Sequence, residues 1–246
     1  MTLRKIRLKA DNMFTQSDQI RDYVFPIATV ASIDNSFAFK EFLGTGFLIG
    51  NRGFALTAAH VVQQFDNQEI VAMFVLDSGE WLGVPIKNFE MHKHEDVAVI
   101  KVQGNTWKSL FKLSNTFEGS AVKYRMFGYP DDIIHEIVSG GRAQPRPDLI
   151  YTEGYVRRRV SFELPAVIGT SFFELSDVAG PGCSGSPIFK FTKPTWDVIG
   201  IYVGEKINGR ATSVAYAVRE ESFREWIPNL LGTSILAESQ NVSLPQ

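Results

Sequence analysis

The residues best suited to chemistry lie in one short stretch, Gly180-Pro181-Gly182-Cys183-Ser184-Gly185-Ser186-Pro187. Glycines stand on both sides of the Cys183-Ser184 pair, and glycine allows a tight turn on which a serine hydroxyl is exposed. On such a turn the backbone amides of Gly182 and Ser184 can point together at a developing oxyanion. A hydroxyl is a weak nucleophile without a base beside it, so the stretch predicts a histidine held by a carboxylate elsewhere in the chain.

Candidates for both partners stand at the ends of earlier β-type runs. Residues 53–62 read as a strand that ends at His60, after the small residues Thr57-Ala58-Ala59. Asp96 begins the apolar run 97–102, so its carboxylate is expected to be buried at one end of a strand. Glu95 is the near alternative, and strand alternation turns its side chain to the opposite face. Taken singly, His60 also fits a core histidine, and Asp96 also fits a strand-capping acid.

Together these motifs resemble those of the trypsin-like (chymotrypsin-fold) serine peptidases. Within that family the chain looks most similar to the bacterial glutamyl endopeptidases and the high-temperature-requirement proteases. The resemblance extends from about residue 25 to about residue 227. Four segments carry it: Gly44-Thr45-Gly46-Phe47 through His60, residues 96–102, Gly128-Tyr129-Pro130, and residues 182–204. Each motif is weak alone, whereas the four in this order and spacing are a strong signal.

The resemblance implies a serine endopeptidase that acts on polypeptides through an acyl-enzyme. It assigns His60 as the general base, Asp96 as the acid that orients it, and Ser184 as the nucleophile, because the family uses this order. The amides of Gly182 and Ser184 would form the oxyanion hole, and no cofactor is needed. Viral relatives place a nucleophilic cysteine where Ser184 stands, so Cys183 is one residue too early and is expected to be a small buried side chain.

In this family two segments wall the pocket for the residue before the scissile bond. They match residues 176–180 and 201–205 here, which gives the candidate pocket residues Asp177, Val178, Tyr202, Val203 and Gly204. In glutamyl endopeptidases the position of Tyr202 is a histidine that pairs with the substrate carboxylate, so Tyr202 argues against a preference for glutamate. Asp177 fits either the acid of a pocket for basic residues or an ordinary loop residue.

Composition narrows the classes of protein that fit. The 246 residues suit one large domain or two small subdomains, and 44% hydrophobic with 21% charged residues is typical of a globular chain. A net charge of −2 argues against a nucleic-acid binder that relies on phosphate contacts. The single cysteine excludes an intramolecular disulfide. His92 and His94 have no cysteine or acid cluster in ligand spacing around them, so no metal site is predicted.

The sequence predicts neither a membrane segment nor a signal peptide. The basic residues 1–11 have no apolar run behind them, and no run is long and apolar enough to span a bilayer. We therefore expect a cytoplasmic protein rather than a secreted one. In secreted trypsin-like enzymes an aspartate before the nucleophile pairs with a freed α-ammonium group. Cys183 holds that position here, so we expect no activating N-terminal cleavage.

The resemblance leaves two rival interpretations open. One is a peptide-binding module that keeps the fold without turnover. The other is a protease that stays latent until a regulatory protein partner binds.

The expected fold is all-β. Short β-type runs with turn residues between them favour a barrel or a sandwich, and the resemblance implies two six-stranded antiparallel β-barrels with a C-terminal helix. The expected organisation is an N-terminal arm (1–22), a first barrel (23–115), a second barrel with its helix (116–231) and a flexible tail (232–246). Residues 130–147 read as a surface loop. Phe223, Trp226 and Ile227 predict a helix over 219–227.

Overall fold

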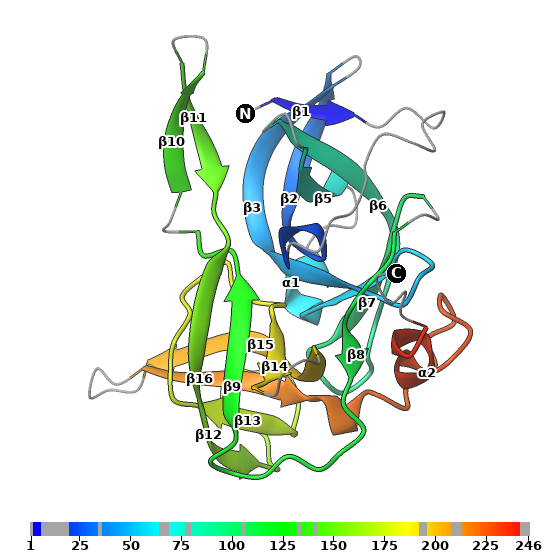
Figure 1. The fold of residues 1–246 in the computed structure, drawn as a ribbon, viewed down its shortest axis with the longest axis vertical. Helices are drawn as coiled ribbons and strands as arrows, with labels where there is room; N and C mark the ends of the chain where they lie inside the picture. The colour runs from blue at the N-terminus through cyan, green and yellow to red at the C-terminus, as the bar shows by residue number, and fades with distance from the viewer. Residues whose placement is uncertain are drawn as a thin grey trace.

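Apolar or alternating strands close into two β-barrels, which Figure 1 shows one above the other in a computed structural model of the chain. The structure describes residues 2–5, 20–33, 36–63, 69–76, 80–104, 107–131, 134–139, 142–191, 196–207 and 213–241. The predicted fold class, all-β with two six-stranded antiparallel barrels, is confirmed.

The first barrel is built by strands from the N-terminal half of the chain. They are β1 (Thr2–Lys5), β2 (Val24–Ile33), β3 (Ser36–Ile49), β4 (Phe54–Thr57), β5 (Glu69–Val75), β6 (Trp81–Met91) and β7 (Ala98–Val102). The barrel follows the order β3-β2-β5-β6-β7-β4, and the pairing of β3 with β4 closes it. All neighbours in this ring are antiparallel. β1 adds a further strand beside β3 and also pairs with β6.

The second barrel repeats this closure with later strands. They are β9 (Lys123–Gly128), β12 (Ile150–Val160), β13 (Phe172–Leu175), β14 (Pro187–Lys190), β15 (Asp197–Ile207) and β16 (Ser213–Arg219). The order is β14-β9-β12-β13-β16-β15, and β14 closes the ring by pairing with β15 as well as with β9. The short strand β8 (Lys112–Leu113) lies parallel to β15.

The core consists of two apolar clusters, and the larger one connects the two barrels. The interior of the second barrel contains one cluster, made of Tyr124, Met126, Val156, Phe173, Leu175, Cys183, Ile188, Ile199, Tyr202, Ala215 and Ala217. A larger cluster fills the first barrel and continues between the barrels. There the ring of Phe111 packs against Phe47 and Phe189, at centroid distances of 6.3 and 4.8 Å. This packing fixes the barrels against each other, so that residues from both can meet at one site.

The sequence predicted a surface loop over residues 130–147, but part of this segment forms strands. These strands are β10 (Ile134–Ser139) and β11 (Arg142–Pro147), which pair antiparallel as a separate two-stranded sheet (Figure 1). In the chain they come after β9 and before β12. The interpretation as a loop gave too much weight to glycine and proline. Proline is tolerated in an edge strand, and both strands of a two-stranded sheet are edges.

The C-terminal region also differs from the expectation. Over 219–227 there is only the 3-10 turn η2 (Glu220–Ser222), and the helix α2 lies later, at Ile235–Ser239. Phe223 is buried whereas Ile227 is 63% exposed, so the two do not share a buried helical face. α2 falls within the segment expected to be a tail, yet Glu238 is buried there and accepts a hydrogen bond from Arg52 Nε at 2.9 Å. Residues 242–246 lie outside the described residues.

Part of the expected N-terminal arm has regular structure. β1 lies within it, and Ile20–Asp22 form a 3-10 turn, η1, just before β2. Residues 6–19 are outside the described part of the chain. Across the residues that the structure describes, none of the helices has the length and apolar character needed to cross a membrane.

Candidate active site

His60 and Asp96 come together at one end of the first barrel. His60 lies in the short helix α1 (Ala59–Gln63), just after β4, and Asp96 stands two residues before β7. β4 and β7 are neighbours in the sheet, so their ends are adjacent. One carboxylate oxygen of Asp96 lies 2.6 Å from His60 Nδ1, and the other accepts a hydrogen bond from the backbone amide of His60 at 2.9 Å.

The two members of this pair differ in exposure. The side chain of Asp96 is 4% exposed, whereas that of His60 is 37% exposed. A buried carboxylate beside Nδ1 favours the tautomer that carries its proton there, which leaves Nε2 as the basic nitrogen. The imidazole therefore presents Nε2 on the side that is turned away from the acid.

Glu95 has a different set of contacts. Its carboxylate accepts hydrogen bonds at 3.3 Å from both the amide and the hydroxyl of Thr170, in the loop between β12 and β13. Its backbone amide donates to His92 Nδ1 at 3.0 Å. Glu95 thus contacts the second barrel, while Asp96 contacts His60.

The turn that carries Ser184 lies between the two barrels. Its Gly185 amide donates to the backbone of β15 at 2.7 Å, and the carbonyl of Ser184 accepts from the amide of Thr45 in β3 at 2.8 Å. Gly185 has a φ of +92°, and a Cβ there would overlap the carbonyl of Thr45 and the hydroxyl of Thr57. Only glycine fits this position. The turn is therefore in direct contact with Thr57, three residues before His60.

Two amides on this turn have no hydrogen-bond partner among the described residues. The carbonyl of Pro181 accepts from the amide of Asp131 at 2.9 Å, and the carbonyl of Cys183 accepts from an amide three residues later at 3.0 Å. In a trans peptide the N–H points opposite to the C=O, so the following amides, those of Gly182 and Ser184, point away from these anchors. Neither amide donates a hydrogen bond within the part of the chain that the structure describes.

The other amides of the turn are occupied. The amide of Cys183 donates to Gly180 O at 3.4 Å, and that of Gly185 donates to β15. The two amides without a partner thus stand one residue apart, on the same turn as a serine hydroxyl. Such donors can stabilise a negative oxygen that develops during a reaction.

Ser184 and His60 are not joined by a hydrogen bond. Within the described ranges, neither Ser184 Oγ nor His60 Nε2 has another hydrogen-bond partner. Catalytic hydrogen bonds are often long without substrate and tighten when it binds. Both atoms are therefore available for a reacting group.

Cys183 points into the second barrel. Its side chain is buried in the cluster with Tyr202, and its Sγ donates to Ala179 O at 3.2 Å. The sequence-based expectation of a small buried side chain agrees with this position.

The structure separates the candidate pocket residues of β15. A Cβ placed on Gly204 would lie 3.8 Å from Ser184 Oγ, so this residue borders the hydroxyl directly. Val203 is buried in the core shared by the barrels. Tyr202 was expected to line the pocket, but its side chain is 1% exposed and its hydroxyl accepts from the amide of Ala179 at 3.3 Å. Burial raises the pKa of Tyr202, so its hydroxyl is neutral at physiological pH.

Asp177 and Val178 lie at the surface of the second barrel. The carboxylate of Asp177 accepts from the hydroxyl of Ser176 at 2.7 Å, and Val178 is partly exposed. A Cβ on Gly154 of β12 would lie 2.5 Å from Asp177 Oδ2, so this acid packs beside β12. No described contact joins Asp177 to Ser184.

The histidines before Asp96 have structural contacts. His92 Nδ1 accepts from the amides of His94 and Glu95, and its ring lies edge-on to Trp226 at a centroid distance of 5.1 Å. Across the described residues, no three histidine, cysteine, aspartate or glutamate side chains form a group that could hold a metal ion.

Two residues that hold the serine turn have no role predicted from the sequence. The backbone amide of Asp131 donates to the carbonyl of Pro181, and the hydroxyl of Thr45 donates to Gly182 O at 3.0 Å. The available signal was their position, because Thr45 lies in the Gly44-Thr45-Gly46-Phe47 motif and Asp131 directly follows Gly128-Tyr129-Pro130.

The fold is similar to that of several solved proteases. The protease domain of MamO from Magnetospirillum magneticum aligns with a TM-score of 0.62 and 13% identity, over 83% of this chain and 95% of that domain. The HtrA-type protease AlgW, with a decapeptide, gives a TM-score of 0.56 at 15% identity over 82% of this chain, which spans 62% of AlgW. Deg5 gives 0.54 at 17% identity, over 82% of this chain and 85% of Deg5.

At these identities the solved structures establish the fold alone. No curated protein sequence matches the chain significantly. The family model for the trypsin-like peptidase domain, however, matches residues 44–201, which include His60, Asp96 and Ser184. This match covers more than half of the chain, and the two closed antiparallel barrels agree with it. The chain belongs to the trypsin-like peptidase family.

Proposed function

We propose that the protein is a serine endopeptidase with His60, Asp96 and Ser184 as its catalytic triad. The observation that carries the proposal is the pair of unpartnered amides, Gly182 and Ser184, on the turn beside an Asp-oriented histidine. On this proposal a nucleophile, a base and two oxyanion donors meet where the barrels pack together. These are the components that acyl transfer requires.

The proposed reaction has two halves. Ser184 Oγ attacks the carbonyl carbon of the scissile peptide bond while His60 Nε2 takes the hydroxyl proton, and the carbonyl oxygen gains negative charge between the amides of Gly182 and Ser184. His60 gives its proton to the leaving amine as the C–N bond breaks, which leaves an acyl-enzyme. Water then attacks the ester with His60 as the base, and the proton returns to Ser184. Asp96 stabilises the imidazolium in both halves, and no step needs a cofactor.

A polypeptide substrate is consistent with the relatives. AlgW has been solved with a decapeptide and with a tripeptide. Gly204 lies beside Ser184 and has no side chain, so the backbone of a bound segment can approach the hydroxyl there.

One observation favours the second candidate, a latent protease or a peptide-binding module. The hydrogen bond from Ser184 to His60 that would activate the nucleophile is not formed. A regulatory partner or the substrate would then have to close this contact.

Labelling with a fluorophosphonate reporter tests the proposal, because the probe needs an activated serine and a working oxyanion hole. We expect the wild-type chain to be labelled, Ser184→Ala to show none, and Cys183→Ser to keep most of it. Turnover of a peptide library should follow the same order. Labelling lost in Cys183→Ser but kept in Ser184→Ala would refute the assignment. A folded wild-type chain that neither labels nor cleaves peptides would favour the latent or binding module.

A further inference from the structure

Thr45 has hydrogen bonds on every one of its polar groups, and it is fully buried. Its amide donates to Ser184 O at 2.8 Å, and its hydroxyl donates to Gly182 O at 3.0 Å. The same hydroxyl accepts from the amide of Tyr129 at 3.1 Å, and the carbonyl of Thr45 accepts from the hydroxyl of Thr57 at 2.7 Å. One residue of the first barrel thus binds both sides of the serine turn, which belongs to the second.

The direction of these bonds is fixed by their chemistry. A backbone N–H can only donate, so the hydroxyl oxygen of Thr45 must be the acceptor for Tyr129. Its own proton is then free for the carbonyl of Gly182, which can only accept. The hydroxyl therefore relays one hydrogen bond from the segment at Tyr129 to the serine turn.

The carbonyl of Gly182 belongs to the central peptide group of the serine turn. Its peptide group stands between the two whose amides have no partner, those of Gly182 and Ser184. Asp131 holds the carbonyl before this group, and the amide of Thr45 holds the carbonyl of Ser184 after it. Gly182 has a φ of +86°, and a Cβ on it would lie 2.6 Å from Tyr129 O. The turn is therefore packed closely against the same segment that orients the hydroxyl of Thr45.

We infer that the hydroxyl of Thr45 is a positioning residue that keeps the amides of Gly182 and Ser184 aimed at the oxyanion. The inference rests on the proposed function, because it explains how the proposed hole is ordered. Without the hydroxyl, the half-buried carbonyl of Gly182 loses its donor within the first barrel, and its peptide group is free to move toward another donor. This rigid peptide group joins the Cα atoms of residues 182 and 183, so its displacement would shift the two flanking peptide groups that carry the amides of Gly182 and Ser184. The neighbouring Cys183 directs its Sγ into the second barrel, where it contacts Ala179 O at 3.2 Å.

The test uses three variants of the full chain. Thr45→Val removes the hydroxyl at nearly constant shape, and Thr45→Ser retains it. Thr29→Val is the matched control, because Thr29 is a buried threonine of the adjacent strand β2 whose hydroxyl has no hydrogen-bond partner in the described structure. Should Thr45→Val fail to fold, Thr45→Ala replaces it.

Two readouts separate the inference from the proposed function. The first is the rate of fluorophosphonate labelling, with kcat and KM for peptide cleavage. Thr45→Val should lower the labelling rate and kcat by about 10- to 100-fold, which is less than the loss of a whole oxyanion donor, with KM and the pH profile little changed. Thr45→Ser and Thr29→Val should stay near the wild-type rate. The second readout is hydrogen exchange at the amide of Tyr129, which should become about tenfold faster in Thr45→Val only.

The outcomes are distinguishable. A Thr45→Val variant that labels as fast as wild type overturns the inference, and so does an equal loss of labelling in Thr29→Val. If the folded wild type fails to label, the proposed function fails. Hydrogen exchange at the amide of Tyr129 then tests the inference. An exchange rate that is the same in Thr45→Val and wild type would refute it.

Discussion

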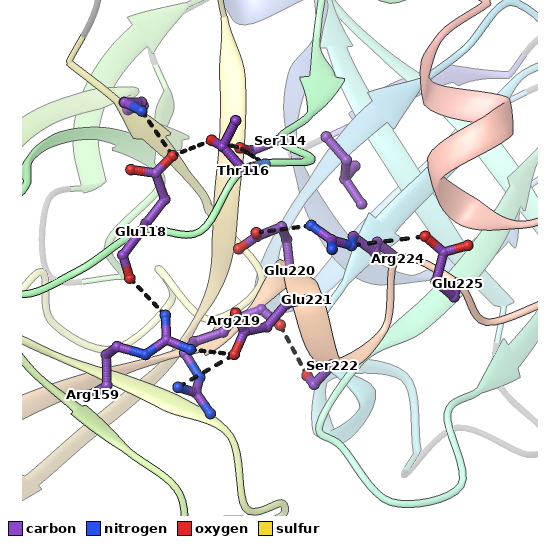
Figure 2. Close-up of polar contacts among 12 residues, drawn as sticks. Ser114, Thr116, Glu118, Arg159, Arg219, Glu220, Glu221, Ser222, Arg224 and Glu225 are labelled. Carbon is purple, nitrogen blue, oxygen red and sulfur yellow. Dashed lines mark hydrogen bonds and ion pairs between the residues drawn. The ribbon is translucent and has the colours of Figure 1, made fainter.

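The buried carboxyl of Glu220 predicts a stability that falls as pH rises. Glu220 begins η2 at the end of β16 and is 1% exposed. Neither of its carboxylate oxygens accepts a hydrogen bond from another residue in the described part of the chain, and Arg224 Nη1 is 3.8 Å away. Figure 2 shows Arg159 and Arg219 turned toward Glu221 instead. Burial raises the pKa of Glu220 to about 8, and repulsion from Glu221 adds to this shift.

The sign of the effect follows from proton linkage. The unfolded chain releases this proton near the ordinary pKa of 4.5, whereas the folded chain keeps it to about pH 8. Between these values the folded state binds a proton that the unfolded state has lost. The free energy of unfolding therefore has its full value below pH 4.5 and falls as the pH rises through 8. At about 1.4 kcal/mol per pH unit, the loss is on the order of 3 kcal/mol at pH 7 and 5 kcal/mol above pH 8.

Glu220→Gln removes the ionisation and keeps the shape of the side chain. It should raise the free energy of unfolding by about 3 kcal/mol at pH 7, more at pH 9, and little at pH 4. Urea unfolding followed by tryptophan fluorescence at these three pH values measures the difference. The matched control is Glu225→Gln, whose carboxylate lies 3.7 Å from the same Arg224 but is 71% exposed. It should change stability by less than about 0.5 kcal/mol throughout. A Glu220→Gln variant that is less stable than wild type at pH 9 would show that Arg224 stabilises a charged carboxylate, and would refute the reasoning.

The proposed site makes three further predictions. Asp96→Asn should lower kcat by about 10⁴-fold, because an amide no longer selects the reactive tautomer of the histidine; steady-state kinetics should show a far smaller effect for Glu95→Gln, and equal losses would contradict the assignment. Cleavage after glutamate should be weak, because the neutral, buried hydroxyl of Tyr202 supplies no cation; a peptide-library profile with glutamate preferred before the cut would disprove this. Activation should need no cut near Ile27, which pairs with strands on both sides within β2; fluorophosphonate labelling that appears only after such a cut, located by mass spectrometry, would show the opposite.

The barrels were predictable because their strands have local signals. β9 alternates between half-buried and buried residues along its length, which is the pattern that a half-exposed strand leaves in a sequence. The hairpin of β10 and β11 was missed because proline is tolerated only in edge strands, and the sequence alone does not show which strands lie at an edge. The early prediction of a helix near Phe223 failed for a similar reason. Its apolar spacing fits a helix, but in the folded chain Phe223 packs into the core and Ile227 is exposed, and spacing alone does not reveal this packing.

Residue types and their order were enough to name candidate site residues, but not to predict which way their side chains and amides point. Ile201, Tyr202 and Val203 are all buried, so alternation along β15 could not tell which side chain would face a substrate. The arrangement of the amides at Gly182 and Ser184 depends on the backbone angles of the turn, and glycine permits several sets of them.

The contact of Thr45 with Gly182 spans 137 positions and exists only after both barrels close and pack together. A sequence shows that Thr45 is a polar residue in an apolar run, which marks it as unusual without naming its partner. The structure supplies that partner, and with it a physical reason for a hydroxyl at this point of the core. If the reason is correct, a serine at position 45 should suffice and a valine should not. Simple hydrophobic packing of β3 would favour the opposite order.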